Sequence, residues 1–390
     1  MTQAIVVINS GSTSLKFAGY ATGDTLSVVC RGEVEGMQDH PRFSVASGDG
    51  RALAQHDWGQ GKTLDHKEAL HFALSWIEQN IPGLKIVAAG HRVVQGGTRF
   101  AGPARIDADT LAYLDGLSVV EPSHQPFNVR GIKAIAAAFP GLPQVASFDT
   151  SFHHDMPEVA KTYAVSKTLR DAGVRHWGYH GISYDFISRK VKTVAPTARR
   201  VIAAHLGGGA SMCAMLDGKS VETTMAFAGL TGLPMATRSG DVPADALFYV
   251  LRRGILDVAG LEKSLYHDAG LIGLSGLSGD MRELQDSKDP HAVAAVDYFV
   301  YSLVKYTGAY AAVLGGLDAF VFTAGIGENS APVRAALCKN LAWLGVEIDA
   351  VANARNAERI STPASKVSVF VIPTNEELMI AQHTVSILAL

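Results

Sequence analysis

Cysteine is scarce in this sequence, and its few copies have no paired spacing. The 390 residues include only Cys30, Cys213 and Cys338, which lie far apart and form no CxxC pattern. This argues against a disulfide framework and a structural zinc site, and it fits a reducing compartment. We therefore expect a cytoplasmic protein.

Long apolar runs and a strong charge of either sign are also missing. The longest apolar stretch, residues 310–326, is interrupted by Asp318 and three glycines, and the first residues lack the basic region of a signal peptide. The net charge is −3 and the pI about 6.5, so nothing attracts nucleic acid or an acidic membrane in bulk. We expect small-molecule partners, with anion binding confined to local clusters.

The familiar nucleotide-binding signatures are absent as well. Gly61-Lys62-Thr63 resembles the end of a P-loop, but His56 occupies the position of the required upstream glycine. No GxGxxG follows a predicted strand, and no GxSxG occurs. A P-loop ATPase, a nicotinamide-dependent dehydrogenase and a Ser/His/Asp hydrolase are therefore disfavoured.

Strand-like and helix-like segments alternate along the chain. Short apolar runs predict strands at 4–8, 86–89, 145–148, 201–204, 319–322 and 367–372. Helices are predicted at 66–80, 129–139, 184–194, 243–253, 291–314 and 332–344. The alternation indicates an α/β fold, and 390 residues exceed the usual size of one core, so we expect two domains.

One short pattern occurs twice. Residues 5–12 and 201–208 each contain an apolar strand, a polar residue and a small-residue turn, with Asn9 and His205 at matching positions about half the chain apart. The repetition suggests a duplicated domain in which each half opens with a strand–turn–strand element.

Three turns rich in glycine or small hydroxyl residues lie at 9–16, 205–211 and 322–329. Backbone N–H groups in such turns can converge on an anion, and Lys16 adds a positive charge to the first. The third is expected to pass from a strand through a glycine turn to a helix near Pro332, an arrangement that binds nucleotides at a helix N-terminus. Each turn alone is more often structural, but three together favour phosphate binding.

Polar clusters rich in arginine and histidine follow several predicted strands. They include Arg92, Asp149, His180 and Arg238. Phosphoryl transfer to a carboxylate brings two anions together, so it requires permanent cations but no general base, because the nucleophile is already ionised. These residue types fit a carboxylate kinase whose site lies in a cleft between two domains.

In this order the segments closely resemble the acetate kinase family. The resemblance rests on NSGSTSLK, GHRVV, EPSHQPFN, FDTSFH, YHGIS, HLGGGAS, ATRSGD, SGDMRE, FTAGIGEN and TNEELMIA, from Asn9 to Glu377. It implies two duplicated actin-like ATPase (ribonuclease H-like) domains, 1–149 plus 378–390 and the nucleotide-binding 150–377, with an active-site cleft between them. It also implies a homodimer that transfers the ATP γ-phosphoryl directly to acetate, with Mg²⁺ or alternatively Mn²⁺.

The resemblance further implies a role for each matching residue. The catalytic residues would be Arg92, Asp149, His180 and Arg238, and the metal would be organised through water by Asn9 and Glu376. The substrate-binding residues would be Arg92, Val94, Ser123, His124, Tyr179 and Gly229. The nucleotide-binding residues would be Lys16, His205, Leu206, Gly207, Gly208, Gly209, Asp280, Met281, Arg282, Gly325, Ile326, Gly327, Glu328 and Asn329.

The sequence departs from the family pattern at several positions. Gln95 and Tyr184 stand where the family usually has histidine, and Gly208 stands where it usually has asparagine. In the expected acyl pocket, Ser123, Tyr179 and Gly229 replace bulkier or more apolar types. Since one methylene changes specificity only modestly, a propionate or broader short-chain acyl kinase remains the alternative.

A nucleotide-binding module with a chaperone-like role is the rival from another functional class. Such a module would not need Arg92 and Arg238 together, and it would normally carry a separate peptide-binding domain. The resemblance leaves no segment for one, so the kinase interpretation is favoured.

Overall fold

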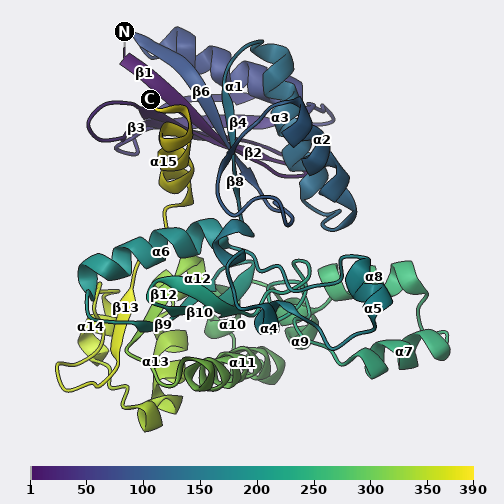
Figure 1. Cartoon of the computed structure of the whole chain (residues 1–390), viewed down its shortest axis with the longest axis vertical. Coiled ribbons are helices and arrows are strands. Elements are labelled where there is room, and N and C mark those ends of the chain that lie inside the picture. Colours follow the sequence, from purple (N-terminus) through teal and green to yellow (C-terminus); the bar gives the residue numbers. More distant parts are fainter. Residues whose placement is uncertain (1) are drawn as a thin grey trace. The chain divides into compact units, whose positions relative to one another are not determined.

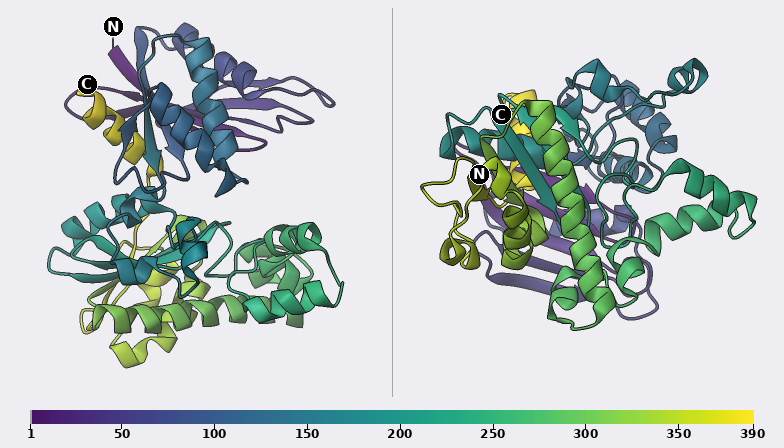
Figure 2. Two further views of the ribbon diagram at one scale, coloured as in Figure 1. Left: turned by 45° about the vertical axis from the view of Figure 1, so that its right-hand side comes forward. Right: turned by 90° about the horizontal axis from the view of Figure 1, so that it is seen from below.

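The structure, a computed structural model, describes residues 2–390. The chain divides into two compact units, one containing residues up to His154 together with Asn375–Leu390, the other Asp155–Thr374 (Figures 1 and 2). The expected boundaries were 149/150 and 377/378. Helix α15 (Glu376–Leu388) packs on strands of the N-terminal unit, so Glu376 belongs to that unit rather than to the C-terminal one.

A single mixed sheet forms the centre of the N-terminal unit. Within the described residues its strand order is β5-β4-β3-β2-β1-β6-β8-β7. The strands are β1 (Thr2–Ser10), β2 (Leu15–Ala21), β3 (Ser27–Glu35), β4 (Arg42–Ser47), β5 (Ala52–Asp57), β6 (Leu84–Val93), β7 (Ala104–Arg105) and β8 (Gln144–Phe148). Strands β1, β6 and β8 run parallel, whereas β1 to β5 form antiparallel pairs.

Helices cover both faces of the central strands of this sheet. Helices α1 (His66–Asn80) and α3 (Gln125–Ala138) pack together over β1 and β6, with α2 (Ala108–Gly116) beside α3. Helix α15 covers the opposite face at β1, β6 and β8 (Figures 1 and 2). Helix α1 begins where its sequence predicts, because Asp65 and Glu68 form a reciprocal capping box.

The C-terminal unit repeats the same sheet plan. In the described chain its strand order is β11-β10-β9-β12-β13, formed by β9 (Arg200–Leu206), β10 (Ala210–Leu216), β11 (Lys219–Thr223), β12 (Ala319–Thr323) and β13 (Ser368–Val371). The strands β3-β2-β1-β6-β8 have the same order and directions. The duplication predicted from the repeated sequence pattern is therefore confirmed.

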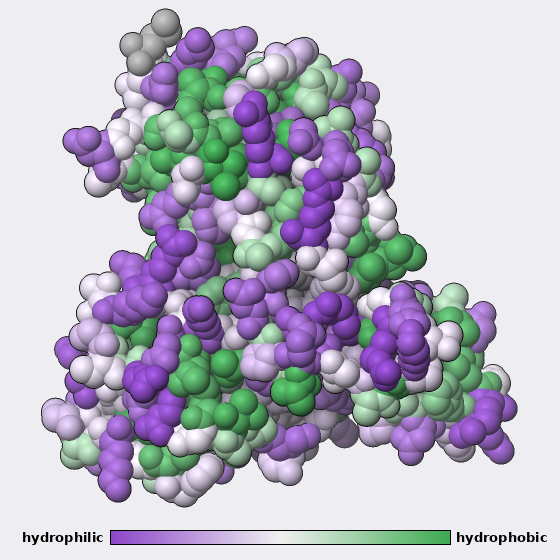
Figure 3. Space-filling model, viewed as in Figure 1, coloured by the Kyte–Doolittle hydropathy of each residue, from purple (hydrophilic) through white to green (hydrophobic). Residues whose placement is uncertain are grey.

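Helices make up most of the remaining C-terminal unit. They are α4 (Glu158–Lys161), α5 (Lys167–Asp171), α6 (Gly181–Val194), α7 (Ala244–Arg252), α8 (Val258–His267), α9 (Gly270–Ser275), α10 (Met281–Asp286), α11 (Pro290–Leu314), α12 (Ala324–Asn329), α13 (Ala331–Asn340) and α14 (Ala350–Ala354). Within residues 2–390, no helix combines the length and apolar character needed to cross a membrane. Figure 3 shows polar and apolar residues mixed on one face of the molecule.

Candidate active site

Parallel strands bring three predicted site residues to one edge of the N-terminal sheet. Ile8 on β1 pairs with His91 on β6, so Asn9 lies level with Arg92, and Arg92 in turn pairs with Ser147 on β8. Asp149 follows β8 directly, and its N–H donates to Val93. The carboxyl ends of parallel strands are the usual position for chemistry in α/β enzymes.

Arg92 and Asp149 form a fork-to-carboxylate pair at this edge. The Arg92 NH2 group donates to Asp149 Oδ2 at 2.7 Å and Nε donates to the same oxygen at 3.2 Å. Burial would lower the pKa of the Arg92 guanidinium, but the carboxylates of Asp149 and Glu376 raise it above its ordinary value. Burial also raises the pKa of the Asp149 carboxyl, and Arg92 opposes this shift. The pair fixes a cation in a setting with little water.

Helix α15 brings Glu376 close to Arg92 and Asp149. The negative charge of the Glu376 carboxylate raises the pKa of both side chains. The close approach of the helix depends on Gly90 in β6, where a Cβ would collide with Thr384 and lie 2.8 Å from Ile380. The next residue, Glu377, accepts a hydrogen bond from Arg31 Nε at 2.8 Å. Close packing and this ion pair therefore hold the first turn of α15.

The expected acyl-binding residues of this unit lie just after β6 and just before α3. Val94 is buried, and its N–H donates to Asn128 Oδ1 at 3.0 Å. Ser123 and His124 both contact the carboxylate of Glu121, which is only 1% exposed. Glu121 was not among the predicted site residues. Its place as the first residue of the EPSHQPFN segment could have indicated it.

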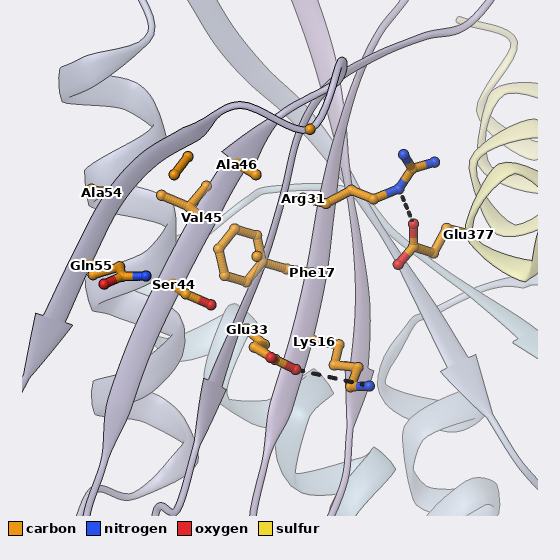
Figure 4. Close-up of a pocket in the computed structure, with 13 residues that line it drawn as sticks. Lys16, Phe17, Arg31, Glu33, Ser44, Val45, Ala46, Ala54, Gln55 and Glu377 are labelled. Carbon is orange, nitrogen blue, oxygen red and sulfur yellow. Dashed lines mark hydrogen bonds and ion pairs between the residues drawn. The ribbon is translucent and has the colours of Figure 1, made fainter. Parts of the chain in front are cut away.

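Lys16 lines a cavity of about 350 Å³ on the N-terminal unit. Its Nζ lies 3.9 Å from Glu33, and Arg31 and Glu377 form the second ion pair along the same wall (Figure 4). The Lys16 side chain is 61% exposed, so it can turn toward a phosphate.

In the C-terminal unit the second glycine turn lies against the third predicted anion-binding segment. His205 on β9 pairs with Thr323 on β12, and a Cβ on Gly207 would lie 3.7 Å from that of Ala324. The expected glycine turn at the third segment is wrong, because residues 324–329 form the short helix α12. Glu328 closes this helix by accepting the Ala324 N–H at 2.7 Å.

His180 stands at the start of α6 in a left-handed conformation, with φ 58°. Such a backbone is costly for a non-glycine residue and is concentrated at functional sites. Its Nδ1 lies 2.8 Å from Ser211 Oγ, and its ring stacks on His205 with centroids 4.2 Å apart. Tyr184 also reaches Ser211 Oγ, at 2.6 Å. The network fixes the orientation of the imidazole.

One loop brings Arg238 to Gly229, and Tyr179 contacts Phe227, two residues before Gly229. The Arg238 NH1 group donates to the Gly229 carbonyl at 2.8 Å, and the buried Tyr179 hydroxyl donates to Phe227 at 2.8 Å. Gly229, one of the predicted acyl-binding residues of this unit, thus lies beside Arg238, which is predicted to be catalytic.

The segment Asp280–Arg282 approaches the glycine turn through one intermediate residue. The Ala236 N–H donates to Gly208 at 3.2 Å, and a Cβ on Gly279 would lie 2.8 Å from the Ala236 carbonyl. Hydrogen bonds from the Arg282 side chain and backbone lower the pKa of the Asp280 carboxyl to about 2. Asp280 caps the N-terminus of α10, which is a structural role that requires no bound ligand.

Comparison with known proteins decides the family. The description "Acetokinase family" belongs to a family model that matches residues 4–382. This chain belongs to the acetokinase family. It is 44% identical to the acetate kinase of Rhodopseudomonas palustris over 98% of both chains. It is 45% identical to that of Nitrobacter hamburgensis over 99% of this chain and 96% of the relative.

Solved structures of family members have the same fold. The acetate kinase of Porphyromonas gingivalis matches 99% of this chain and 100% of its own, with a TM-score of 0.90 at 33% identity. A propionate kinase from Francisella tularensis matches 98% and 99%, with a TM-score of 0.92 at 34% identity. The two units therefore have the actin-like ATPase fold of the acetokinase family.

Asn9 and Glu376 supply oxygen atoms near the strand ends where the metal is expected. Within residues 2–390 no cluster of three or more His, Cys, Asp or Glu side chains could enclose a metal. Mg²⁺ does not require such a cluster, because it keeps several waters and binds substrate phosphates beside one or two protein oxygens. Glu376 and Asn9 at the edge beside Arg92 fit that mode of binding.

Several side chains that support His180 and His205 were not among the predicted site residues. Ser211 and Tyr184 support His180, whereas Ser183 Oγ contacts His205 Nδ1 at 2.9 Å. Ser183 and Tyr184 lie one helical turn after His180, and that spacing could have indicated both. Ser211 lies in the HLGGGAS segment, but no sequence signal indicates that it contacts His180, because Ser211 lies on β10 whereas His180 begins α6.

Proposed function

We propose that this chain is an acetate kinase that transfers the γ-phosphoryl of ATP to acetate, giving acetyl phosphate and ADP reversibly. The pairing of Arg92 with the buried Asp149 at the strand ends, in a member of the acetokinase family, carries the proposal. A guanidinium held by a carboxylate keeps its position and charge while it binds a second anion.

The mechanism that we propose assigns each charged residue a task in one in-line transfer. Arg92 binds the acetate carboxylate, and Asp149 orients Arg92. Arg238 and His180 donate to the oxygens of the phosphoryl group as negative charge redistributes over them. Acetate is already the nucleophile and needs no base, so positioning and charge neutralisation supply the catalysis.

Substrate and metal binding follow from the remaining residues. Glu376 and Asn9 would hold Mg²⁺ through water, and Mn²⁺ has similar ligand preferences. When bound, the metal would neutralise charge on the phosphates. The nucleotide would be held by Lys16, His205–Gly209, Asp280–Arg282 and Gly325–Asn329.

We propose acetate as the preferred acid, with a propionate or broader short-chain acyl kinase as the alternative. Gly229 accepts a hydrogen bond from Arg238, and the Tyr179 hydroxyl donates to Phe227, so the expected acyl-binding residues of the C-terminal unit combine a small and an aromatic group. One methylene changes specificity by about 1–3 kcal/mol. Kinetics with acetate, propionate and butyrate will rank the three acids, and a steep loss of activity with propionate would reject the alternative.

We also propose that the protein is a cytoplasmic homodimer. Helices α7 and α8 of the C-terminal unit bury none of their own residues, and Phe248 and Val258 on them are 57% and 70% exposed. Exposed apolar surface at this density marks an interface, and Figure 3 shows apolar residues over this region at the lower right. A second copy is the partner consistent with the family resemblance.

A hydroxamate assay tests the activity. Purified protein is incubated with ATP, Mg²⁺, hydroxylamine and each acid, and acyl phosphate is trapped as hydroxamate. We expect product with acetate. No product with any short acid would reject the acyl kinase assignment.

Replacing Arg238 tests the mechanism. Arg238→Ala should lower kcat by about 10²–10³-fold while the fold persists, because it removes a donor to the transition state. Circular dichroism reports the fold. Near-normal turnover would exclude this arginine from the chemistry.

A further inference from the structure

One carboxylate closes the loop that carries Arg238. We call the point of closure, where Gly232 meets Asp241, the neck of the loop. Asp241 Oδ1 accepts the Gly232 N–H at 2.8 Å, and the Asp241 N–H donates to the Gly232 carbonyl at 3.1 Å. The same two residues thus exchange a side-chain and a backbone hydrogen bond. Arg238 lies between them in sequence.

Glycine makes this closure possible. Gly240 has φ +70°, and a Cβ there would lie 2.6 Å from the Gly232 carbonyl. Gly232 has φ +97°, and a Cβ there would lie 2.5 Å from the Thr224 carbonyl. The two sides of the neck therefore touch through backbone atoms, and little freedom remains in their register.

A helix outside the loop holds the other oxygen of the carboxylate. Tyr306, on the long helix α11, donates its hydroxyl to Asp241 Oδ2 through a short hydrogen bond. Because Oδ1 and Oδ2 are engaged from different elements, the Asp241 side chain is restricted to one orientation. Helix α11 runs through the C-terminal unit, as Figure 2 shows, and provides a rigid support.

The guanidinium of Arg238 depends on the neck for its position. Its NH1 group donates to Gly229, which lies just before the neck, while the Arg238 carbonyl accepts the Met235 N–H at 3.0 Å within the loop. Opening the neck would shift the loop relative to Gly229 and carry the guanidinium with it.

We infer that Asp241, anchored by Tyr306, is a positioning residue that sets the place of Arg238 during phosphoryl transfer. This inference rests on the proposed function for its kinetic consequence. Asp241→Ala should lower kcat about 30- to 100-fold, since a displacement near 1 Å is sufficient, and leave the KM for ATP nearly unchanged. Tyr306→Phe should have a smaller effect in the same direction, and Asp241→Asn should recover part of the activity.

A double-mutant cycle separates positioning from a general structural effect. In an Arg238→Ala background, Asp241→Ala should cost less than about twofold, because the group that it positions is gone. Tyr301→Phe, at a site 63% exposed on the same helix, is the matched control and should leave kcat unchanged. An equal loss from Asp241→Ala in both backgrounds, or an equal loss from the two tyrosine variants, would overturn the inference.

Amide hydrogen exchange provides a readout that does not depend on activity. Asp241→Ala and Tyr306→Phe should each accelerate exchange within residues 229–241, whereas Tyr301→Phe should not. If wild-type protein makes no acyl phosphate, the proposed function fails. Hydrogen-exchange rates then test by themselves whether Asp241 and Tyr306 hold the neck in place. Unchanged exchange in an active enzyme would overturn the inference and leave the function standing.

Discussion

His91 lies next to Arg92 on β6, and its environment makes stability depend on pH. It is 2% exposed, and its Nε2 lies 2.8 Å from Gln144 Oε1. Burial lowers the pKa of His91 to about 4 from its ordinary value of 6.5. The folded protein therefore keeps this imidazole neutral at a pH where the unfolded chain protonates it.

The sign of the effect follows from linkage. As the pH falls below 6.5, the unfolded chain binds a proton that the native state does not bind until the pH reaches about 4. Stability falls through that window, by about 2 kcal/mol between pH 8 and pH 5 for this residue. Urea unfolding at both pH values should show a smaller difference for His91→Gln than for wild type. An equal difference would show that His91 is not the group involved.

At the scale of elements, one buried arginine fixes the position of helix α12. Arg334 is completely buried and donates to the carbonyls of Gly327 and Glu328, each at 2.9 Å. Its other donors reach Asn353 and Asn356 in and after α14. A cation at the carbonyl end of a helix is favourable, and here it also joins α12 to α14.

Removing that arginine should destabilise the C-terminal unit. We expect Arg334→Leu to lower the free energy of unfolding by about 3–5 kcal/mol, because it leaves several buried hydrogen-bond acceptors without a donor. Thermal unfolding measures the loss. Arg355→Gln, at an exposed position on the same segment, should change the melting temperature little. Comparable losses from the two variants would contradict the assignment.

The contact between β6 and α15 leads to a second prediction at this scale. Gly90→Ala should push α15 away from the sheet and cost about 1–3 kcal/mol, because the new methyl meets Thr384 and Ile380. The variant should also need more Mg²⁺ for half-maximal activity, since Glu376 begins that helix. Gly116→Ala, where a Cβ meets no atom within 4 Å, is the control. An unchanged Mg²⁺ requirement would show that Glu376 does not help to hold the metal.

At the scale of the molecule, the C-terminal unit exposes apolar side chains that its own core does not use. Ile255, between α7 and α8, is 59% exposed, beside Phe248 and Val258. A homodimer that covers these residues should elute with about twice the chain mass of 41.3 kDa. Phe248→Glu with Val258→Glu should yield monomers in light scattering. Val119→Glu, at an 83% exposed position on the N-terminal unit, should not. A wild-type monomer would reject the proposal.

Much of the architecture could be predicted from the sequence, because local signals were strong. The helix predicted at 66–80 has the observed bounds of α1, and each predicted strand overlaps an observed one, although 367–372 extends one residue beyond each end of β13. The antiparallel strands β3, β4 and β5 were missed, since their mixed polar sequences show little hydrophobic contrast. The turn expected at residues 324–329 proved helical because the Glu328 side chain closes it, a contact that glycine content does not reveal.

The sequence by itself determined the family, the duplication and the residue types of the candidate site. These depend on short segments whose order and chemistry are specific. Only the tertiary structure decided that Asp149 is the partner of Arg92, that Ser211 supports His180 and that Glu376 belongs to the N-terminal unit. The physical reason is that strand register and helix packing join residues distant in sequence, and no local pattern encodes which of them meet.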